Sequence, residues 1–422
     1  MPPSIHNSMT SLLSIRKANS ALRSLTASSP SSVDFSSNDF LSLCHSPALK
    51  AAYLTELTTT PNFHLGSGGS RLLDGNSSYA ETLENEIAAF HNAPAALLFN
   101  SGFDANSGFF ACVPQPGDVV LYDEFVHASV HEGMRLSRAR CCKAFSHNSL
   151  AELKIKIEEA TGDEKVVRGE RNVFVAIESL YSMDGDLAPI EEIVDLVDEL
   201  LPNGNGLVVV DEAHSNGIYG YQGRGIVCGL GIEKRVFARL HTFGKGLACN
   251  GAAILCSPLT REYLINYARP LIYSTSMSFP SLAAIKVVYS LMKQGATQPL
   301  IIYLNELIEY MYQQLSSLLP HVRHSVTGFS LLQLPKDVPR SPIFALLTPE
   351  PRSLAKYCQD DGFVVRAIVP PTVPEGTQRI RVCLHAGNTF QDVDRLVARI
   401  RSWLEKKGGL EKDEKRQVRA VL

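Results

Sequence analysis

Asp211, His214 and Lys245 are the residues whose types and spacing suggest chemistry most strongly. Leu207–Val210 is an apolar run of the kind that forms a buried strand, Asp211 follows it directly, and His214 comes soon after. In an open α/β sheet, ligands bind at the carboxyl ends of the strands. We therefore expect Asp211 and His214 to lie beside a bound cofactor.

Lys245 follows a second segment of the same kind. Val236–Leu240 is mostly apolar and leads into the segment His241–Gly246, in which Gly244 and Gly246 flank the lysine. Because glycine has no side chain, a lysine between two glycines can approach a bound ring closely. Each of these residues has an ordinary explanation when taken alone, as a helix cap or a solvated side chain. Their occurrence in this order favours a cofactor site.

Two competing interpretations involve neighbouring residues. Asp211–His214 also spells a helicase motif, but a helicase needs a phosphate-binding loop with a defined glycine and Ser/Thr pattern. Arg239 stands at the first glycine position of such a loop and Gly246 at the Ser/Thr position, so the pattern fails. His127 and His131 are spaced like a metal-binding pair, yet no third ligand is evident. We predict neither nucleic-acid binding nor a metal site.

Strand-length apolar runs recur along the chain and alternate with helical or glycine-rich segments. This alternation is typical of a parallel sheet covered by helices on both faces. The segment Gly66–Arg71 is rich in glycine, and Ser78 with Glu81 predicts a capping box at the start of a helix. The predicted strands are Ala95–Phe99, Val119–Tyr122, Val173–Ile177, Leu207–Val210 and Ala252–Leu255.

The pattern changes after Pro280. Residues 281–318 are amphipathic and helical with a break near Gly295, and a closing helix is expected at Leu396–Leu404. This mixture predicts a smaller α+β domain. We expect an N-terminal arm (1–45), a large α/β domain (46–285) and a small α+β domain (286–422). The strands predicted in the small domain are Phe329–Leu334, Ile343–Leu347, Val364–Ile368 and Ile380–Leu384.

The composition is ordinary. The chain has 422 residues, 45% of them hydrophobic, with a net charge of −3 and nine scattered cysteines. It has no apolar run of the roughly 20 residues that a membrane helix needs. These features predict a cytoplasmic protein without membrane or nucleic-acid partners.

The two ends of the chain leave an organelle open. Residues 1–33 contain no Asp or Glu, which suits either a mitochondrial transit peptide or, as we favour, an arm that begins with an amphipathic helix. The last three residues, Ala420–Leu422, resemble a peroxisomal signal only at Leu422. Mitochondrial and peroxisomal locations therefore remain alternatives to the cytoplasm.

Taken together, these motifs resemble the α-oxoamine synthases of the fold-type I pyridoxal-phosphate (PLP) superfamily. The resemblance is greatest to the branch that forms 8-amino-7-oxononanoate, more than to aminolevulinate synthase, glycine acetyltransferase or serine palmitoyltransferase (SPT). It implies an aspartate aminotransferase-like α/β large domain and a homodimer in which Ser274 and Thr275 reach the partner's cofactor. The matching segments are Phe35–Asp39, Gly66–Ser70, Ser101–Phe103, His127–Ser129, Ser182–Asp186, Asp211–His214, Thr242–Gly246, Ile272–Ser276 and Pro370–Thr377.

The resemblance assigns roles to the catalytic residues. It implies that Lys245 binds PLP covalently, that Asp211 pairs with the ring nitrogen, that His214 bonds the ring hydroxyl and that His127 stacks on the ring. The other cofactor contacts that it implies, chiefly to the phosphate, come from Thr242, Ser179 and the backbone of Gly102 and Phe103.

The resemblance also implies the reaction, a condensation of an amino acid with an acyl thioester in which carbon dioxide is lost. The expected substrates are L-alanine and pimeloyl-CoA, giving 8-amino-7-oxononanoate for biotin synthesis. Asn38 and Arg381 match ligands of the amino-acid carboxylate, while Arg23 and Thr372 match contacts of the acyl substrate. The expected partners are therefore these two small molecules and a second copy of the chain.

One departure from the family concerns the acyl side. Relatives carry an arginine directly before the Pro-Pro pair, where this chain has Val369. Arg366 lies three residues earlier, and in an extended segment an odd offset places its side chain on the opposite face from that of residue 369. Another acyl-CoA or a polyketide thioester in a secondary pathway is therefore the alternative substrate. An aminotransferase would share the fold but not the acyl-side motifs, and an inactive regulatory subunit would not need Lys245.

Overall fold

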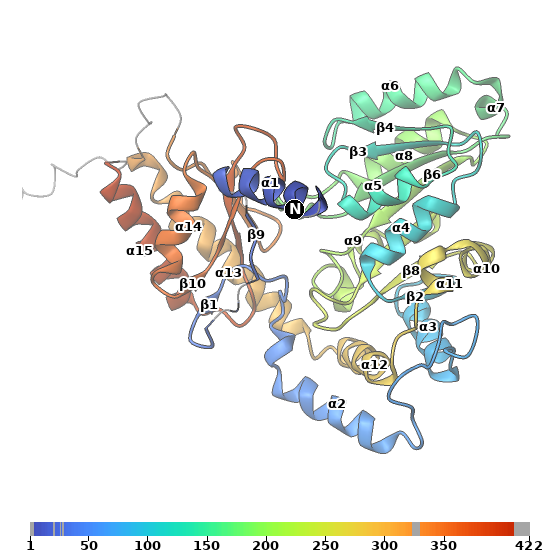
Figure 1. The fold of residues 1–422 in the computed structure, drawn as a ribbon, viewed down its shortest axis with the longest axis horizontal. Helices are drawn as coiled ribbons and strands as arrows, with labels where there is room; N and C mark the ends of the chain where they lie inside the picture. Colours follow the sequence, from blue (N-terminus) through green and yellow to red (C-terminus); the bar gives the residue numbers. More distant parts are fainter. Residues whose placement is uncertain (1–3, 20–21, 26, 28, 323–329, 409–422) are drawn as a thin grey trace, which may run out of the picture.

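The structure, a computed structural model, describes residues 4–19, 22–25, 27, 29–322 and 330–408. Its elements form two lobes, with the seven-stranded sheet in one and the smaller sheets in the other (Figure 1). Phe329, the first residue of one predicted strand, and the C-terminal Ala420–Leu422 lie outside the described residues. The proposed domain boundaries at residues 45 and 285 stay a prediction.

The large lobe is built on a seven-stranded sheet in the order β2-β8-β7-β6-β5-β3-β4. All neighbouring strands pair in parallel except β8, which is antiparallel to β2 and β7. The prediction of a wholly parallel sheet was therefore wrong at this strand. The strands are β2 (Ala95–Phe99), β3 (Val119–Asp123), β4 (Cys141–Phe145), β5 (Val173–Glu178), β6 (Gly206–Asp211), β7 (Ala238–Thr242) and β8 (Ala252–Cys256).

Helices cover both faces of this sheet because its central strands are apolar on both sides. Alternate residues of β5 belong to two separate cores: Phe174 and Ala176 pack on one side, Val175 and Ile177 on the other. The helices of this lobe and its flank are α2 (Pro47–Thr59), α3 (Ser78–Phe90), α4 (Gly102–Cys112), α5 (Ala128–Arg135), α6 (Leu150–Thr161), α7 (Glu164–Val167), α8 (Ile190–Leu200), α9 (Ile226–Leu230), α10 (Pro258–Tyr267) and α11 (Arg269–Tyr273).

The start of α3 differs from the prediction. Its N-cap is Ser77, whose hydroxyl accepts from the backbone N–H of Ala80, and not Ser78. Glu81 instead accepts a hydrogen bond from the side chain of Asn76. The predicted capping box is therefore wrong, because the helix begins one residue earlier than the motif suggests.

The second lobe contains a three-stranded antiparallel sheet, β11-β12-β9, and a short parallel pair, β1-β10. The break predicted near Gly295 separates α12 (Phe279–Lys293), which packs against α2 and α3, from α13 (Gln298–Ser316), which packs against α15 of the second lobe. The other elements of the second lobe are α1 (Ser4–Ala18), β1 (Val33–Asp34), β9 (Ile343–Leu347), α14 (Pro351–Gln359), β10 (Phe363–Val364), β11 (Arg366–Ile368), β12 (Arg379–Cys383) and α15 (Phe390–Lys406).

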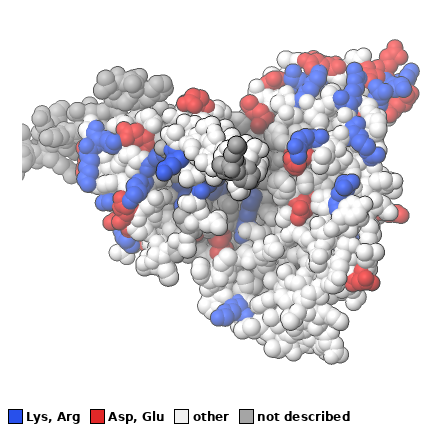
Figure 2. Space-filling view, in the orientation of Figure 1, with Lys and Arg blue, Asp and Glu red and all other residues white. Residues whose placement is uncertain are grey.

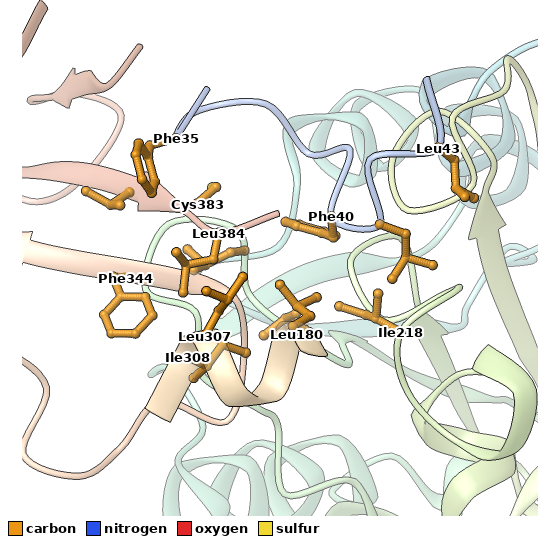
Figure 3. Close-up of a cluster of buried hydrophobic side chains, with 14 of the residues drawn as sticks. Phe35, Phe40, Leu43, Leu180, Ile218, Leu307, Ile308, Phe344, Cys383 and Leu384 are labelled. Atoms are coloured by element: carbon orange, nitrogen blue, oxygen red, sulfur yellow. The ribbon is translucent and has the colours of Figure 1, made fainter. Parts of the chain in front are cut away.

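One continuous apolar core joins the two lobes. Figure 3 shows Phe40 and Leu180 lying between Ile218 on one side and Leu307 and Phe344 on the other. These side chains come from the N-terminal segment, the segments that follow β5 and β6 of the large sheet, and the small lobe. The core therefore fixes the N-terminal segment, which carries Asn38, between the lobes.

The surface bears charges of both signs. In the space-filling view, Lys and Arg alternate with Asp and Glu, and a hollow separates the two lobes (Figure 2). No helix in the described ranges is long and apolar enough to cross a membrane.

Candidate active site

Asp211 and Lys245 come together at the carboxyl edge of the large sheet. Asp211 is the last residue of β6, and Lys245 lies just beyond the end of the neighbouring strand β7. Burial lowers the pKa of Lys245, an effect that Asp211 and Glu178 oppose and Arg381 strengthens. A lysine with a lowered pKa is more readily available as a neutral amine, which is the form that attacks a carbonyl carbon.

Asp211 is held as a buried hydrogen-bond acceptor. Its Oδ1 accepts from the backbone N–H of Ala213 at 2.9 Å, and its Oδ2 accepts from Nδ2 of Asn106 at 2.8 Å. Both hydrogen bonds fix the orientation of the carboxylate. Asp211 can therefore present a fixed negative charge to a cationic or protonated group of a ligand.

His127 belongs to the same network. Asn106 also donates to Oγ of Ser129 at 3.0 Å, and that oxygen lies 2.7 Å from Nδ1 of His127. His127 caps α5, and its side chain is exposed, so a face of the ring is open to a planar ligand. The ring is shielded from water where its Nδ1 meets Ser129, and this partial burial lowers the pKa of His127, with Asp211 opposing the effect and Lys245 adding to it.

His214 is buried on the inner side of the site. Its pKa lies well below the ordinary value because of burial and the nearby charges of Lys245 and Arg381. Its Nδ1 has no hydrogen-bond partner among the described residues. A buried polar atom without a hydrogen bond destabilises the fold, and a ligand atom can supply the missing partner. His214 therefore fits a PLP ring bound beside Asp211 and Lys245, because the ring hydroxyl can pair with this nitrogen.

The residues predicted to hold the phosphate divide into two groups. Gly102 and Phe103 form the first turn of α4, where backbone N–H groups have no partner within the helix, and Gly102 lies against Thr242. The hydroxyl of Thr242 donates to the carbonyl of Gly251 at 3.2 Å. Ser179 is fully buried, and its hydroxyl lies 2.9 Å from that of Ser215. Ser179 is therefore engaged within the protein, whereas Gly102 and Phe103 remain able to donate.

Asn38 and Arg381 meet at the junction of the lobes. Nη2 of Arg381 donates to Oδ1 of Asn38 at 2.9 Å, and Nε of Arg381 donates to the carbonyl of Ser182 at 2.6 Å. Arg381 is buried, and its charge lowers the pKa values of both Lys245 and His214. The two predicted carboxylate ligands thus lie together and close to the rest of the site.

A pocket of about 470 Å³ opens between the lobes beside His127. One wall is the segment Glu124–Ala128 with His131, another is Tyr181–Asp184, and the third is Pro371–Pro374, which includes Thr372. Arg23, in contrast, is exposed after α1 and does not line this pocket. The structure therefore brings Thr372, but not Arg23, to the pocket beside His127.

Three features of the site were not predicted from the sequence. Asn106 gave no local signal, since an amide one turn into a helix is common. Glu178 ends β5 as Asp211 ends β6, and this repeated pattern could have identified it. His147 lies between the carboxylates of Asp123 and Asp186, at 2.9 and 2.7 Å.

The chain is similar over nearly its whole length to proteins of known family. The family described as "Aminotransferase class I and II" matches residues 30–400. An 8-amino-7-oxononanoate synthase of Emericella nidulans is 52% identical over 96% of this chain and 97% of its own. The aminoacyl transferase sphA of Aspergillus fumigatus is 37% identical over 94% of this chain and 86% of its own.

A solved structure has the same fold. SPT with PLP covers 89% of this chain and 88% of its own, with a TM-score of 0.77 and 23% identity. This likeness confirms the predicted α/β fold of the PLP fold-type I class. The chain belongs to the class I and II aminotransferase family and, within it, to the α-oxoamine synthases.

Proposed function

We propose that this protein condenses L-alanine with pimeloyl-CoA, releasing carbon dioxide and coenzyme A and forming 8-amino-7-oxononanoate for biotin synthesis. The observation that carries the proposal is the site of Asp211, His214 and Lys245 in a chain 52% identical to a synthase of this name. The site supplies the groups that the reaction needs: an amine, a fixed negative charge and a carboxylate-binding arginine.

PLP, when bound, supplies an electron sink that stabilises negative charge on the α-carbon of the amino acid. Lys245 holds the cofactor and, once free, removes and returns a proton at the α-carbon. The ionised Asp211 keeps a proton on the ring nitrogen. His214 bonds the ring hydroxyl through its unpartnered nitrogen, and His127 covers a face of the ring.

Arg381 and Asn38 orient the amino acid. A guanidinium binds a carboxylate through parallel hydrogen bonds, and burial of Arg381 strengthens them because water competes less. Fixing the carboxylate here holds the α-carbon near Lys245.

The pocket beside His127 receives the acyl thioester. Its walls are mixed, with Phe125, Tyr181, Met183 and Val373 supplying apolar surface beside His127. An acyl chain that lies against these side chains has its carbonyl carbon near the amino acid.

We also infer a homodimer. Leu65, Leu73 and Tyr273 are 75%, 78% and 74% exposed. Tyr273 adjoins Ser274 and Thr275, which the family resemblance places at the partner's cofactor, and the backbone N–H of Ser276 donates to the carbonyl of Gly69 in the loop between Leu65 and Leu73. Exposed apolar side chains grouped in this way are typical of a protein interface. Light scattering would give twice the 46.2 kDa mass of one chain; an active protein of single mass would contradict the dimer.

The function is tested with the purified protein and PLP. L-alanine, glycine and L-serine are each combined with pimeloyl-CoA, and products are identified by mass spectrometry. We expect 8-amino-7-oxononanoate from L-alanine as the main product. Because one methylene changes selectivity by only about 1–3 kcal/mol, glycine and serine should react slowly. No condensation product from any pair would contradict the proposal.

The second candidate function is the same condensation with a different acyl thioester, such as one that carries a monocarboxylic or polyketide chain. Among its lining residues, the pocket beside His127 contains no lysine or arginine. Arg366 lies directly opposite Arg381 in the β11-β12 pair and lines a separate pocket with Asp34 and Ser37. A dicarboxylic chain would therefore lack a guanidinium partner at this pocket. Comparing pimeloyl-CoA with octanoyl-CoA separates the two: a clear preference for octanoyl-CoA favours the second candidate.

A further inference from the structure

Glu178 and Asp211 are carboxylates at the ends of neighbouring strands. They are partners in the register of β5 and β6, so their side chains leave the sheet on the same face. That face is the one covered by α4 and α5, where Asn106 and Ser129 lie. Both carboxylates are buried, with 4% and 7% of each residue exposed.

The surroundings of the two carboxylates differ. Asp211 accepts hydrogen bonds from Asn106 and Ala213, which stabilise its charge. Glu178 forms no ion pair within the described part of the chain, and the backbone N–H of His127 is the donor that faces it. Buried groups without compensating partners favour their neutral form.

The charged and titratable groups that act on Glu178 come from four neighbouring elements and from its own loop. Asp211 faces it from β6, Lys245 from the loop after β7, Asp123 from β3 and His127 from the start of α5. Tyr181 lies on its own loop and accepts from the backbone N–H of Glu178 at 3.4 Å. Asp123 is paired with His147. Lys245 is thus the one lysine or arginine among these groups.

The balance of these groups favours the acid form. Burial raises the pKa of Glu178 well above its ordinary value, the charge of Asp211 raises it further, and Lys245 only partly opposes them.

We propose that Glu178 is a positioning residue that keeps its proton in the working enzyme, so that Asp211 alone presents a negative charge to the ring nitrogen of PLP. An ionised Glu178 would repel Asp211 and favour a proton on Asp211. A protonated Asp211 could no longer hold the ring nitrogen in its protonated form. This inference rests on the proposed function, since the ring nitrogen belongs to PLP.

The first test is direct and does not need activity. The infrared difference spectrum of wild type minus Glu178→Gln is recorded at neutral pH, with and without PLP. We expect a carbonyl band of a protonated carboxylic acid that belongs to wild type, and that disappears as the pH is raised. A difference spectrum with carboxylate bands alone would overturn the proposal. Circular dichroism and thermal melting establish that Glu178→Gln is folded.

The second test uses the bound cofactor. Glutamine has the size of the neutral acid, so the PLP affinity of Glu178→Gln should stay within about threefold of wild type, as for the control Glu309→Gln on the exposed side of α13. At alkaline pH, wild type should lose affinity while Glu178→Gln does not. A loss of about tenfold or more in Glu178→Gln at neutral pH would show that the charge is needed and overturn the proposal. If wild type shows the infrared band of the protonated acid but does not bind PLP, the proposed function is contradicted, while the inference that Glu178 keeps its proton still stands.

Discussion

The guanidinium of Arg381 donates a hydrogen bond of 2.9 Å to the side-chain oxygen of Asn38, a residue 343 positions earlier in the chain. The contact joins β12 of the small lobe to the N-terminal segment that the apolar core fixes between the lobes. The two segments thus form one site for the carboxylate of a substrate. The hydrogen bonds to Asn38 and Ser182 already hold Arg381 in place in the absence of substrate.

Arg381→Lys should raise the KM for L-alanine. An ammonium cannot reproduce the paired hydrogen bonds of a guanidinium, and the lost bonds to a charged group amount to about 1.5–3 kcal/mol, or roughly 10- to 100-fold. Steady-state kinetics with L-alanine varied provides the measurement, and Arg395→Lys on the exposed side of α15 serves as the control. An unchanged KM in Arg381→Lys would argue against its role.

Lys245→Ala should abolish covalent attachment of PLP. The alanine has no amine to react with the cofactor aldehyde. Borohydride reduction followed by peptide mapping should find the cofactor on the Lys245 peptide of wild type and of Lys50→Ala, an exposed-site control. Modification at another lysine with Lys245 untouched would refute the assignment.

Asp211→Asn should keep the fold but slow exchange of the α-proton of L-alanine with solvent. The amide cannot supply the charge, and loss of a charged hydrogen bond costs about 3 kcal/mol, which is more than roughly 100-fold in rate. Proton NMR in deuterium oxide follows the exchange. A wild-type rate would show that Asp211 does not hold the ring proton.

The sequence predicted the buried parts of the fold well, for a physical reason. Strands covered on both faces are continuous apolar runs, so β2, β3, β5, β6 and β8 could be located. The edge strand β4, with half-buried Cys141 and exposed Lys143, has no such run and was missed. The direction of β8 was also missed, because an apolar run looks the same in either direction.

The residues of the site also fall into two groups, those that the local sequence indicates and those that only the folded structure brings together. Asp211, His214 and Lys245 follow strand ends, where local sequence reports position in the sheet. The contact of Asn106 with Asp211 depends on how α4 packs, and the meeting of Asn38 with Arg381 depends on how the lobes join. Packing over such sequence separations leaves no local pattern; for Asn38 and Arg381, only the family resemblance indicated a shared role.

His147 should stabilise the protein in a pH-dependent way. Burial alone would lower the pKa of His147, but hydrogen bonds to Asp123 and Asp186 raise it to about 10. Because the folded-state pKa is raised, the stabilisation is complete below the unfolded pKa near 6.5 and is lost as the pH rises through about 10. His147→Gln should therefore be destabilised at pH values near neutral and approach wild type above about 10. Urea unfolding across this range, with exposed His45→Gln as the control, provides the measurement; a constant difference would contradict the ion pairing.

The most direct test of decarboxylative condensation follows the carboxyl carbon of the amino acid. Carboxyl-labelled L-alanine is incubated with the PLP-loaded protein, with and without pimeloyl-CoA, while labelled carbon dioxide and free thiol are measured together. We expect that both are released in equal amounts, that both need the acyl thioester, and that Lys245→Ala releases neither. Carbon dioxide without thiol, or transfer of the amino group to a keto acid with the label retained, would contradict it.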